Sequence, residues 1–372
     1  MARGGRLLDV ALLKAEIEKY TQDADLGLIE KAYKFARLAH QGQKRASGED
    51  FIEHPLAVAG ILAGLELDVI TIAAAVLHDV VEDTPVTLEQ VRAEFGDEIA
   101  LLVDGVTKLS RLEYRSREEE QVENLRKMFL AMARDIRVVL IRLADRLHNL
   151  RTLQYLSEEK QREVARETLE VFAPLAHRLG MFRIKSEMED LALACLEPEK
   201  FNEIKRLVSL RRKQRESYIE RVIGILREHL ARVGVKADIR GRPKHYYSIY
   251  KKMYEQGRDF SEIYDLIAVR IIVDTVKDCY GALGVVHTLW KPIPGRFKDF
   301  IAMPKSNMYQ SLHTSVIGPE GEPFEIQIRT WEMHRTAEYG IAAHWKYKEG
   351  RTDPDLDEKL SWLRQILDWQ QD

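Results

Sequence analysis

The spacing of the apolar residues changes near residue 233, and this change limits the possible folds more than any other feature of the chain. From residue 7 to residue 232, apolar residues recur three or four positions apart, for example in residues 28–40, 67–83 and 137–153. This period is typical of amphipathic α-helices. Beyond residue 233 the apolar runs are short and rich in β-branched residues, which is typical of strands. The sequence therefore predicts a helical part followed by an α+β part.

The strands of the second part can be placed from the Gly, Pro and Asn residues that separate its apolar runs. We expect strands at residues 266–273, 282–290, 299–304, 312–318 and 324–330. Helical spacing returns at residues 245–256 and 331–347.

The length of 372 residues leaves room for two or three domains, because a typical domain has about 150 residues. We expect a multidomain α and α+β protein. Its four segments are a helical domain, linking helices, a mixed-sheet domain and a C-terminal helical tail, at residues 1–155, 156–200, 201–345 and 346–372.

Composition excludes several classes of protein. Charged residues make up 31% and hydrophobic residues 45% of the chain, which excludes a disordered chain. The longest apolar run, residues 69–77, is too short to span a bilayer, and charged residues interrupt the apolar start, so we expect no signal peptide. Only two cysteines occur, Cys195 and Cys279, which favours a cytoplasmic protein over a disulfide framework or zinc ribbon. A net charge of −3 excludes a molecule that attracts nucleic acid over its whole surface.

The string HDVVED at residues 78–83 places one histidine and three carboxylates within two helical turns: His78, Asp79, Glu82 and Asp83. Residues four apart share a helix face, so these carboxylates repel one another unless a cation binds between them. His54 and Asp145 are the candidates for the remaining ligands. Two histidines and two aspartates suit manganese or iron better than a closed structural zinc site. The sequence therefore predicts a divalent metal site.

This ordered set of His54, His78, Asp79 and Asp145 resembles the HD superfamily of metal-dependent phosphohydrolases. The strings HDVVEDT and LADRLHNLRTL resemble its RelA/SpoT branch, the bifunctional alarmone enzymes. The resemblance implies that the four residues bind Mn²⁺ and that the chain hydrolyses the 3′-pyrophosphate of ppGpp and pppGpp to give GDP or GTP. It also implies that the neighbouring carboxylates orient or deprotonate the attacking water, namely Glu82 and Asp83.

The polar connector GQKRASGED at residues 42–50 has two interpretations. By itself, its composition fits a flexible surface loop equally well. The resemblance instead implies that the connector and the helix after Asp145 line the nucleotide pocket of the hydrolase, with Lys44, Arg45, Ser47, Asn149 and Thr152.

Basic residues concentrate between residues 206 and 252, where fourteen Lys and Arg occur with only four acidic residues. The last part, GRPKHYYSIYKKM, forms a turn that leads into a helix and carries Arg242, Lys244, Ser248 and Lys252. Cations and a hydroxyl along one stripe suit a triphosphate. The alternative is a basic amphipathic helix on the surface.

Two carboxylates stand at the starts of expected strands. Asp265 precedes the strand at 266–273, and Glu325 opens the strand at 324–330. In a basic environment such a pair suits Mg²⁺ on a substrate phosphate. Residues 296–316 add more polar and cationic side chains than packing explains: Arg296, Lys298, Lys305, Asn307, Tyr309, Gln310 and His313. Tyr309 fits either base stacking or an ordinary half-buried position.

These strings are similar to the synthetase domain of the RelA/SpoT enzymes, and the similarity covers most of residues 30–345. It implies a nucleotidyltransferase-like sheet that transfers pyrophosphate from ATP to the 3′-hydroxyl of GDP or GTP and releases AMP. By this resemblance the 242–252 stripe binds ATP, the residues of 296–316 bind GDP or GTP, and Asp265 and Glu325 hold Mg²⁺. Glu325 is also the candidate base. The string RFKD at 296–299 is similar to the RxKD variant of the bifunctional members.

Two further expectations follow from the resemblance. Long members continue into domains that contact the ribosome and uncharged tRNA, so we expect this chain to be a catalytic half without those partners. Because two opposed activities would together consume ATP, we expect the helical stretch at residues 156–232 to be a two-state element that favours one site at a time.

Three other functions are compatible with parts of the sequence. A phosphohydrolase whose second half only binds regulatory nucleotides would release no AMP from ATP and GDP. An RNA-modifying nucleotidyltransferase with an HD domain is disfavoured, because Asp265 has no carboxylate two residues later. A nucleic-acid-binding module built on residues 206–252 predicts steeply salt-dependent RNA binding, and it leaves the acidic HDVVED cluster unexplained.

Overall fold

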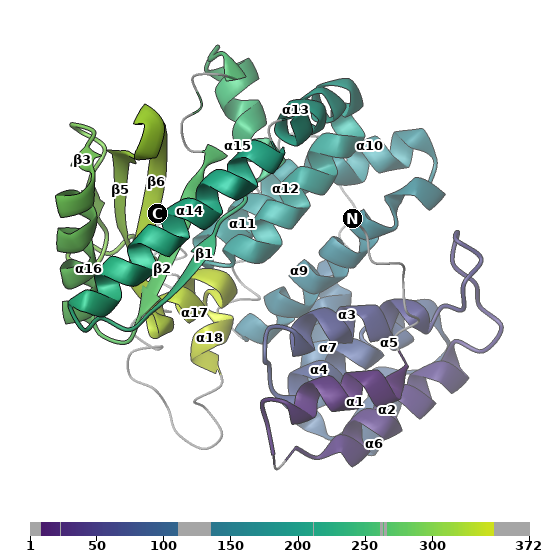
Figure 1. Cartoon of the computed structure of the whole chain (residues 1–372). Helices are drawn as coiled ribbons and strands as arrows, with labels where there is room; N and C mark the ends of the chain where they lie inside the picture. The colour runs from purple at the N-terminus through teal and green to yellow at the C-terminus, as the bar shows by residue number, and fades with distance from the viewer. Residues whose placement is uncertain are drawn as a thin grey trace, which may run out of the picture. The chain divides into compact units, whose positions relative to one another are not determined.

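The computed structural model describes residues 9–22, 24–110, 135–210, 212–260, 263 and 266–345. The chain divides into two compact units (Figure 1): residues 1–167 with 342–372 form unit 1, and residues 168–341 form unit 2. The described part of unit 1 is helical, whereas unit 2 combines helices with a mixed sheet. This confirms the predicted fold class of a helical domain followed by a mixed-sheet domain.

Unit 1 contains short and medium helices joined by brief loops. Its described helices are α1 (Val10–Glu18), α2 (Leu26–Ala39), α3 (Glu53–Ala63), α4 (Val69–Leu77), α5 (Val80–Asp83), α6 (Leu88–Phe95), α7 (Asp97–Ser110), α9 (Ile136–Arg151), the 3₁₀ turn η1 (Leu153–Tyr155), α10 (Glu158–Glu167) and α18 (Ala342–Trp345).

Helix α4 forms the centre of unit 1. Every residue from Thr71 to Leu77 is buried, and the helix contacts α2, α3 and α7. It starts at Asp68, whose carboxylate accepts hydrogen bonds from the Thr71 amide and hydroxyl at 2.9 and 2.6 Å, so the first turn is capped. Because the helix runs through the core, the residues at its C-terminal end, His78 and Asp79, are delivered to the interior of the unit.

Unit 2 begins with helices and continues into the sheet. Its described elements are the π-helical turn η2 (Thr168–Phe172), α11 (Ala173–Arg178), α12 (Phe182–Leu196), α13 (Pro198–Leu210), α14 (Arg212–Arg232), β1 (Ala237–Gly241), α15 (Tyr246–Tyr250), the π-helical turn η3 (Lys251–Glu255), β2 (Ala268–Val273), α16 (Val276–Leu289), β3 (Lys291–Pro292), β4 (Lys298–Asp299), β5 (Leu312–Ile317), the 3₁₀ turn η6 (Pro319–Gly321), β6 (Pro323–Thr330) and α17 (Trp331–Tyr339).

The strands of unit 2 form one mixed sheet in the order β1-β2-β6-β5-β3, with β4 paired to β5. Strands β2 and β6 are parallel, and Ala268 lies opposite Glu325 in their register. The other pairs are antiparallel. The parallel pair at the centre places the starts of β2 and β6 at the same edge of the sheet.

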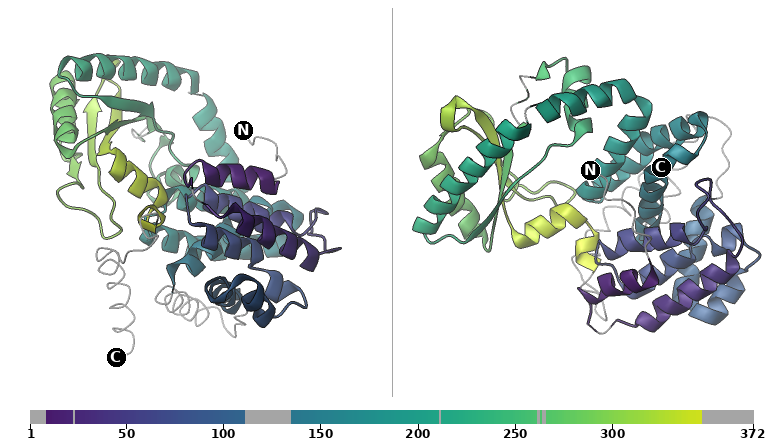
Figure 2. Two further views of the ribbon diagram at one scale, coloured as in Figure 1. Left: turned by 90° about the horizontal axis from the view of Figure 1, so that it is seen from below. Right: turned by 45° about the vertical axis from the view of Figure 1, so that its right-hand side comes forward.

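Side chains alternate between the two faces of the sheet, and this alternation separates core from site. Val269 and Ile271 on β2, and Phe324 and Ile326 on β6, pack into one apolar cluster with residues of α14 and α16. Figure 2 shows these two helices along one side of the sheet. The intervening residues of β6, such as Glu325, face the opposite side. The helix-covered face is therefore the core, and the other face carries polar groups.

Two of the expected strands were wrong. Residues 282–290 lie mostly in helix α16, whose N-terminus is capped by the Thr275 hydroxyl, 3.1 Å from the amide of Asp278. The buried residues Cys279, Ala282 and Val286 follow a helical spacing that their β-branched neighbours obscured. The expected strand at 299–304 ends at Asp299, because its carboxylate accepts from the amides of Ile301 and Ala302 and turns the chain.

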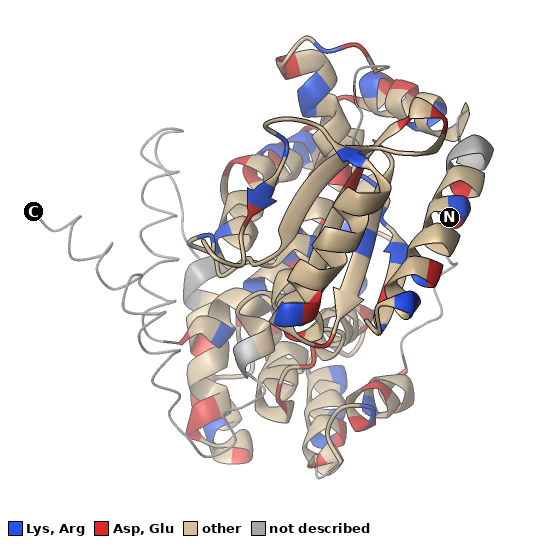
Figure 3. Cartoon of the chain, turned by 60° about the vertical axis from the view of Figure 1, so that its left-hand side comes forward, with Lys and Arg blue, Asp and Glu red and all other residues tan. Residues whose placement is uncertain are grey.

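Charges of both signs are spread over the helices and the sheet (Figure 3). No helix among the described residues combines the length and the apolar character needed to cross a membrane.

Candidate functional site

The four predicted metal ligands converge in unit 1. His54 comes from the first turn of α3, His78 and Asp79 from the link between α4 and α5, and Asp145 from the middle of α9. The His54 Nε2 atom lies 3.2 Å from Asp145 Oδ1 and 3.5 Å from Asp79 Oδ2, and His78 Nε2 lies 3.0 Å from Asp79 Oδ1. Ligand atoms of His54, His78 and Asp145 all lie within 4.8 Å of one another. Residues 91 positions apart in sequence thus form one buried His/Asp centre.

The orientation of His78 is fixed by the backbone. Its Nδ1 atom lies 2.7 Å from the carbonyl oxygen of Ala75, so Nδ1 carries a proton and donates it. The buried Nε2 atom lies 3.0 Å from Asp79 Oδ1, but the two atoms are not aligned for a hydrogen bond. A histidine that donates from one ring nitrogen and leaves the other free is in the form that ligates metals.

Electrostatics in the centre favour a cation. Burial lowers the pKa of His78, but the carboxylates of Asp79 and Asp145 outweigh it and raise that pKa to about 9. Burial alone would raise the pKa of Asp145, yet the contact with His54 and the guanidinium of Arg142 hold it below its usual range. The carboxylates therefore stay ionised and attract either a proton on the imidazole or a metal ion.

These residues fit a divalent cation. Two imidazoles and the Asp145 carboxylate have ligand atoms within 4.8 Å of one another, Asp79 contacts both imidazoles, and the buried Nε2 atom of His78 forms no hydrogen bond. A bound cation would satisfy that nitrogen and offset the charge of Asp79 and Asp145. A mixed nitrogen and oxygen donor set suits manganese or iron.

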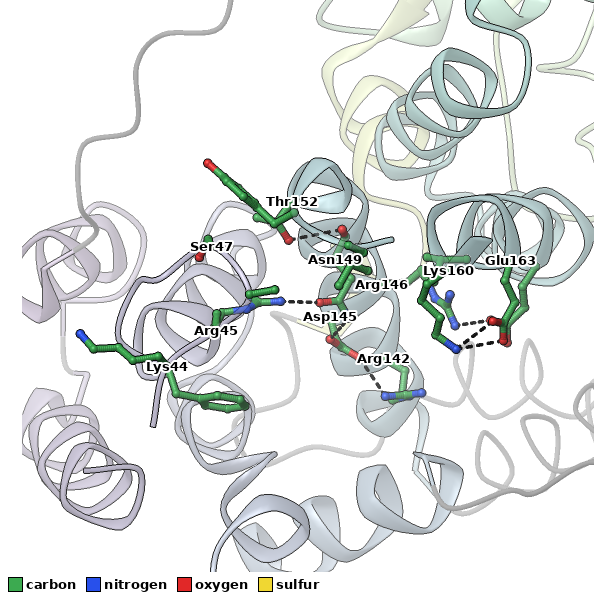
Figure 4. Close-up of a pocket in the computed structure, with 16 residues that line it drawn as sticks. Lys44, Arg45, Ser47, Arg142, Asp145, Arg146, Asn149, Thr152, Lys160 and Glu163 are labelled. Carbon is green, nitrogen blue, oxygen red and sulfur yellow. Dashed lines mark hydrogen bonds and ion pairs between the residues drawn. The ribbon is translucent and has the colours of Figure 1, made fainter. Parts of the chain in front are cut away.

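A cavity of about 510 Å³ opens beside this centre (Figure 4). Its lining includes Asp145 and all five predicted nucleotide-binding residues of the hydrolase: Lys44, Arg45, Ser47, Asn149 and Thr152. Figure 4 shows the Arg45 side chain extending toward α9, where its Nη2 atom donates to Asn149 Oδ1 at 3.0 Å. The connector at residues 42–50 is therefore a wall of the cavity. This arrangement supports its functional interpretation over that of a plain surface loop.

The other two predicted nucleotide-binding residues of the connector, Lys44 and Ser47, make local contacts. Lys44 is exposed and pairs with Asp50 at 2.6 Å, and the Ser47 hydroxyl donates to Glu49 at 3.0 Å. Such exposed pairs contribute little to stability. Both side chains can therefore exchange these partners for a ligand at small cost.

The predicted water-orienting residues lie on the short helix α5. Glu82 and Asp83 are both exposed, and neither belongs to the described lining of the cavity. Burial of its carboxyl group and the nearby Asp79 raise the pKa of Asp83. A carboxylate with a raised pKa is a better proton acceptor, so the proton-transfer role of Asp83 stays a prediction that its electrostatics favour.

Sequence reasoning missed several residues that line the same cavity, among them Arg142, Arg146, Tyr155 and Lys160. Arg142 lies three residues before Asp145 on α9 and donates to its Oδ2 atom at 2.8 Å. It also missed His148, three residues after Asp145, whose Nδ1 atom lies 2.7 Å from that of His54. Burial, together with His54 and Arg45, lowers the pKa of His148 to about 3. Helical spacing around Asp145 was the signal that would have found Arg142 and His148, which lie three positions on either side of it, whereas Tyr155 and Lys160 lie beyond the end of α9.

Unit 2 has a second cavity, of about 500 Å³, on the polar face of the sheet. Glu325 and Gln327 of β6 project into it from alternate positions, and Gln327 Nε2 donates to Glu325 Oε1 at 2.7 Å. The described lining has six cationic side chains and two carboxylates: Arg183, Arg240, Arg242, Arg270, Lys305 and Arg329, with Glu325 and Glu338. This excess of positive charge suits a polyanionic ligand such as a nucleoside triphosphate.

The electrostatics of this cavity reflect the same excess. Burial, Arg242 and Lys305 lower the pKa of His313 to about 3, so its imidazole is neutral at physiological pH. Burial and the adjacent Arg270 lower the pKa of Arg329 to about 10. Burial and Lys298 also lower the pKa of Lys305. Each cation would gain stability from an anion placed in the cavity.

The structure brings together only some of the predicted synthetase residues. Arg242, Lys305, Tyr309, His313 and Glu325 line the cavity. Two of these approach the Glu325 carboxylate: Arg242 Nη1 at 3.9 Å and His313 Nδ1 at 3.8 Å. The described lining does not include the remaining predicted residues, which are Lys244, Ser248, Lys252, Arg296, Lys298, Asn307 and Gln310. Asp265 lies outside the described residues.

Two residues of the predicted guanine-nucleotide set have structural partners instead. The side-chain amide of Asn307 donates to the carbonyl of His177 at 3.0 Å, and that of Gln310 donates to the carbonyl of Ile301 at 3.3 Å. Both amides hold the loop between β4 and β5 in place. Their role as direct nucleotide ligands stays a prediction.

Tyr309 lies at the cavity wall but is 9% exposed. Its hydroxyl lies 2.8 Å from His313 Nε2, and Phe182 contacts the ring edge to face, with centroids 5.3 Å apart. The Lys305 ammonium lies 5.3 Å from the centre of the ring. Base stacking on this ring therefore stays a prediction that requires Lys305 to move or to share the ring with the base.

Known protein families match both units. The HD domain matches residues 32–182, and the region found in RelA / SpoT proteins matches residues 241–352. The first match contains the His/Asp centre, and the second contains Arg242 and Glu325. The first match thus contains the whole described lining of the first cavity, and the second contains most of that of the second cavity.

Curated relatives align with nearly the whole chain. A GTP pyrophosphokinase of Streptomyces coelicolor is 55% identical over 368 residues, covering 94% of this chain and 43% of the relative. The bifunctional (p)ppGpp synthase/hydrolase RelA of Mycobacterium tuberculosis is 54% identical over 358 residues, covering 94% and 45%. A guanosine-3′,5′-bis(diphosphate) 3′-pyrophosphohydrolase of Aquifex aeolicus is 48% identical over 361 residues, covering 96% and 51%. The chain spans about half the length of these relatives. Because this chain contains both family regions and aligns with these relatives over nearly its whole length, it belongs to the RelA/SpoT family.

Proposed function

We propose that this chain both makes and degrades the alarmones ppGpp and pppGpp. The observation that carries the proposal is the presence of two different sites in one chain, a buried His/Asp centre beside a basic cavity in unit 1 and a carboxylate within a cationic cavity in unit 2. Relatives that align over nearly all of the chain bear names of a synthetase, a hydrolase or both.

The hydrolase reaction is assigned to unit 1. Water attacks the phosphorus bonded to the 3′-oxygen of ppGpp, the bond between them breaks, and GDP and pyrophosphate leave. His54, His78, Asp79 and Asp145 would hold Mn²⁺, which stabilises charge on the phosphate oxygens and lowers the pKa of water. Asp83, whose pKa is raised, would accept the proton of the attacking water.

Binding of the alarmone is assigned to the cavity beside the centre. Lys44 and Arg45 on the connector, and Arg142 and Arg146 on α9, offer cations to phosphate oxygens. Asn149 and Thr152, with Ser47, offer hydrogen bonds to the nucleoside. The volume of about 510 Å³ is in the range of small-molecule sites.

The synthetase reaction is assigned to unit 2. The 3′-oxygen of GDP or GTP attacks the β-phosphorus of ATP, the bond to the α-phosphate oxygen breaks, and AMP leaves. Arg242 and Lys305 would bind phosphates, with Lys244, Ser248 and Lys252 extending the ATP site. Glu325, with Asp265, would hold Mg²⁺ and accept the 3′-hydroxyl proton, since Glu325 is a carboxylate facing a cavity otherwise rich in cations.

The direct test follows both activities in one preparation of the purified chain. Incubation with labelled ATP, GDP and Mg²⁺ is expected to give ppGpp and AMP in equal amounts, and neither product when GDP is omitted. Isolated ppGpp with Mn²⁺ is then expected to give GDP and pyrophosphate, a reaction that EDTA stops. AMP formation without ppGpp degradation would leave a synthetase alone, and the reverse would leave a phosphohydrolase with a nucleotide-binding second half.

Opposed control of the two sites is a further part of the proposal. A chain that ran both reactions at once would consume ATP without net product. The helical stretch at residues 156–232 contains the π-helical turn Thr168–Phe172, which starts at the first residue of unit 2. Such turns often mark functional sites in helices. A change at this turn that responds to nucleotide would couple the two sites reciprocally.

The coupling can be measured with a non-reactive ATP analogue together with GDP. Saturation of the synthetase cavity is expected to slow ppGpp hydrolysis by about 5-fold or more, the lower end of typical allosteric coupling. The effect should appear in kcat, because simple competition at the hydrolase cavity would raise only the KM for ppGpp. An unchanged rate at saturation would contradict opposed control.

A further inference from the structure

His148 contacts His54, a residue of the His/Asp centre of unit 1, through an uncommon pairing of two ring nitrogens. Its Nδ1 atom lies 2.7 Å from the Nδ1 atom of His54, with the ring centroids 4.9 Å apart. At this distance one nitrogen must donate a proton to the other. Which of the two donates decides the form in which His54 meets a metal ion.

Arg45 settles the direction of that hydrogen bond. Its Nη1 atom lies 3.1 Å from the same Nδ1 atom of His148. A guanidinium can only donate, so Nδ1 of His148 must be an acceptor and carries no proton. The proton between the two rings therefore belongs to Nδ1 of His54, and His148 accepts from both neighbours.

The consequence lies on the far side of the His54 ring. With its proton on Nδ1, His54 presents Nε2 to Asp145 at 3.2 Å and to Asp79 at 3.5 Å. Nε2 is then the atom that can give its lone pair to a cation. Without His148, the His54 Nδ1–H group would lose this hydrogen-bond acceptor. The neutral His54 ring could then carry its proton on Nε2 instead, and a proton there would exclude a metal.

The other terminal nitrogen of Arg45 fixes the orientation of Asn149, which contacts the predicted ligand Asp145. Nη2 of Arg45 donates to Asn149 Oδ1 at 3.0 Å. The carboxamide oxygen must therefore face Arg45, which leaves the Asn149 amide nitrogen to donate to Asp145 Oδ1 at 2.8 Å. The Arg45 guanidinium thus fixes the protonation of the His148 Nδ1 atom, which contacts His54, and the orientation of the Asn149 amide, which contacts Asp145.

We propose that Arg45, through His148 and Asn149, is a positioning residue of the metal centre, which holds His54 and Asp145 in their metal-binding forms before any nucleotide arrives. The proposal rests on the metal centre of the proposed hydrolase. It adds a role to Arg45, because a residue that only bound nucleotide would leave the affinity for the metal alone unchanged.

The test measures Mn²⁺ binding to the full chain without nucleotide, by the electron paramagnetic resonance signal of free Mn²⁺. His148→Leu removes the acceptor, whereas His148→Asn places a carboxamide oxygen close to the position of Nδ1. His148→Gln carries the same group one methylene farther out. The dissociation constant is expected to rise by about 10- to 100-fold in the Leu and Gln variants, the usual effect of losing such a supporting residue. In the Asn variant it is expected to stay within about 3-fold of that of the unaltered chain.

Arg45→Met provides an independent arm, because Arg45 lies on a loop and its loss should not prevent folding. We expect the Mn²⁺ dissociation constant of this variant to rise at least about 10-fold, while Lys44→Met on the same loop leaves it unchanged. Equal Mn²⁺ affinity in the unaltered chain, His148→Leu and Arg45→Met would overturn the positioning role and leave the proposed hydrolase intact. Absence of Mn²⁺ binding to the unaltered chain would overturn both.

Discussion

Replacement of Asp79 by alanine is expected to abolish pyrophosphate release from ppGpp while AMP formation from ATP and GDP continues. The Asp79 carboxylate contacts both histidines of the centre, at 3.5 Å from His54 Nε2 and 3.0 Å from His78 Nε2. Without it the cation loses a ligand, and several kcal/mol of transition-state stabilisation are lost with the cation. Since each ~1.4 kcal/mol corresponds to a factor of ten, hydrolysis should fall by at least about a thousandfold. Labelled pyrophosphate and AMP are measured separately on the same preparation.

The control for this substitution is another carboxylate of unit 1. Asp97 lies at the start of α7, is 83% exposed and pairs with Arg92. Asp97→Ala should leave both reactions unchanged. A fully folded Asp79→Ala protein that still hydrolyses ppGpp would show that the His/Asp centre is not the hydrolytic site. Loss of both reactions in a folded protein would contradict the assignment of the two activities to separate units.

The residues of this centre could be predicted from sequence because of where helices place them. His78 and Asp79 follow directly on the nine residues of α4, which are all apolar except Thr71, and an apolar run of that kind must lie in the core. Its end therefore brings polar groups to the interior, where they need partners. The distance from His54 to Asp145 could not be obtained in this way, because it depends on how α3 packs against α9.

The fold of unit 2 was harder to predict where local preference and tertiary context conflict. Residues 282–290 are rich in valine and threonine, which favour strands, yet the Thr275 cap and the buried face of α16 make them helical. The 324–330 strand was predictable, because apolar and polar residues alternate there. That alternation also places Glu325 on the face opposite the apolar core.

The supporting residues of both sites escaped prediction for a physical reason. The sequence predicts Asn307 and Gln310 as nucleotide ligands, but it does not show that their amides also donate to the backbone carbonyls of His177 and Ile301. Conversely, His148 shares a helix face with Asp145, but its contact with His54 depends on how α3 packs against α9. A polar side chain in sequence shows what it can bond to, whereas its actual partner depends on the tertiary structure.

Replacement of Glu325 by glutamine is expected to stop ppGpp synthesis and leave its hydrolysis unchanged. Glutamine keeps the size of the side chain and can still accept from Gln327, as Glu325 Oε1 does at 2.7 Å. What it removes is a negative charge and a proton acceptor. General-base catalysis contributes about 10²- to 10⁴-fold, so kcat for AMP formation should fall by at least about a hundredfold. Rates are measured with labelled ATP at saturating GDP.

The affinity for ATP separates this explanation from a general disturbance of the cavity. Glu325 stands among six cationic side chains, and a carboxylate there repels the phosphates that those cations attract. Its neutralisation should therefore leave the dissociation constant of a non-reactive ATP analogue, measured without Mg²⁺, unchanged or lower it, even as kcat falls. Glu332→Gln, at an exposed position in the first turn of α17, should change neither quantity. Weaker analogue binding in Glu325→Gln, with kcat preserved, would make Glu325 a binding group and contradict its role as the base.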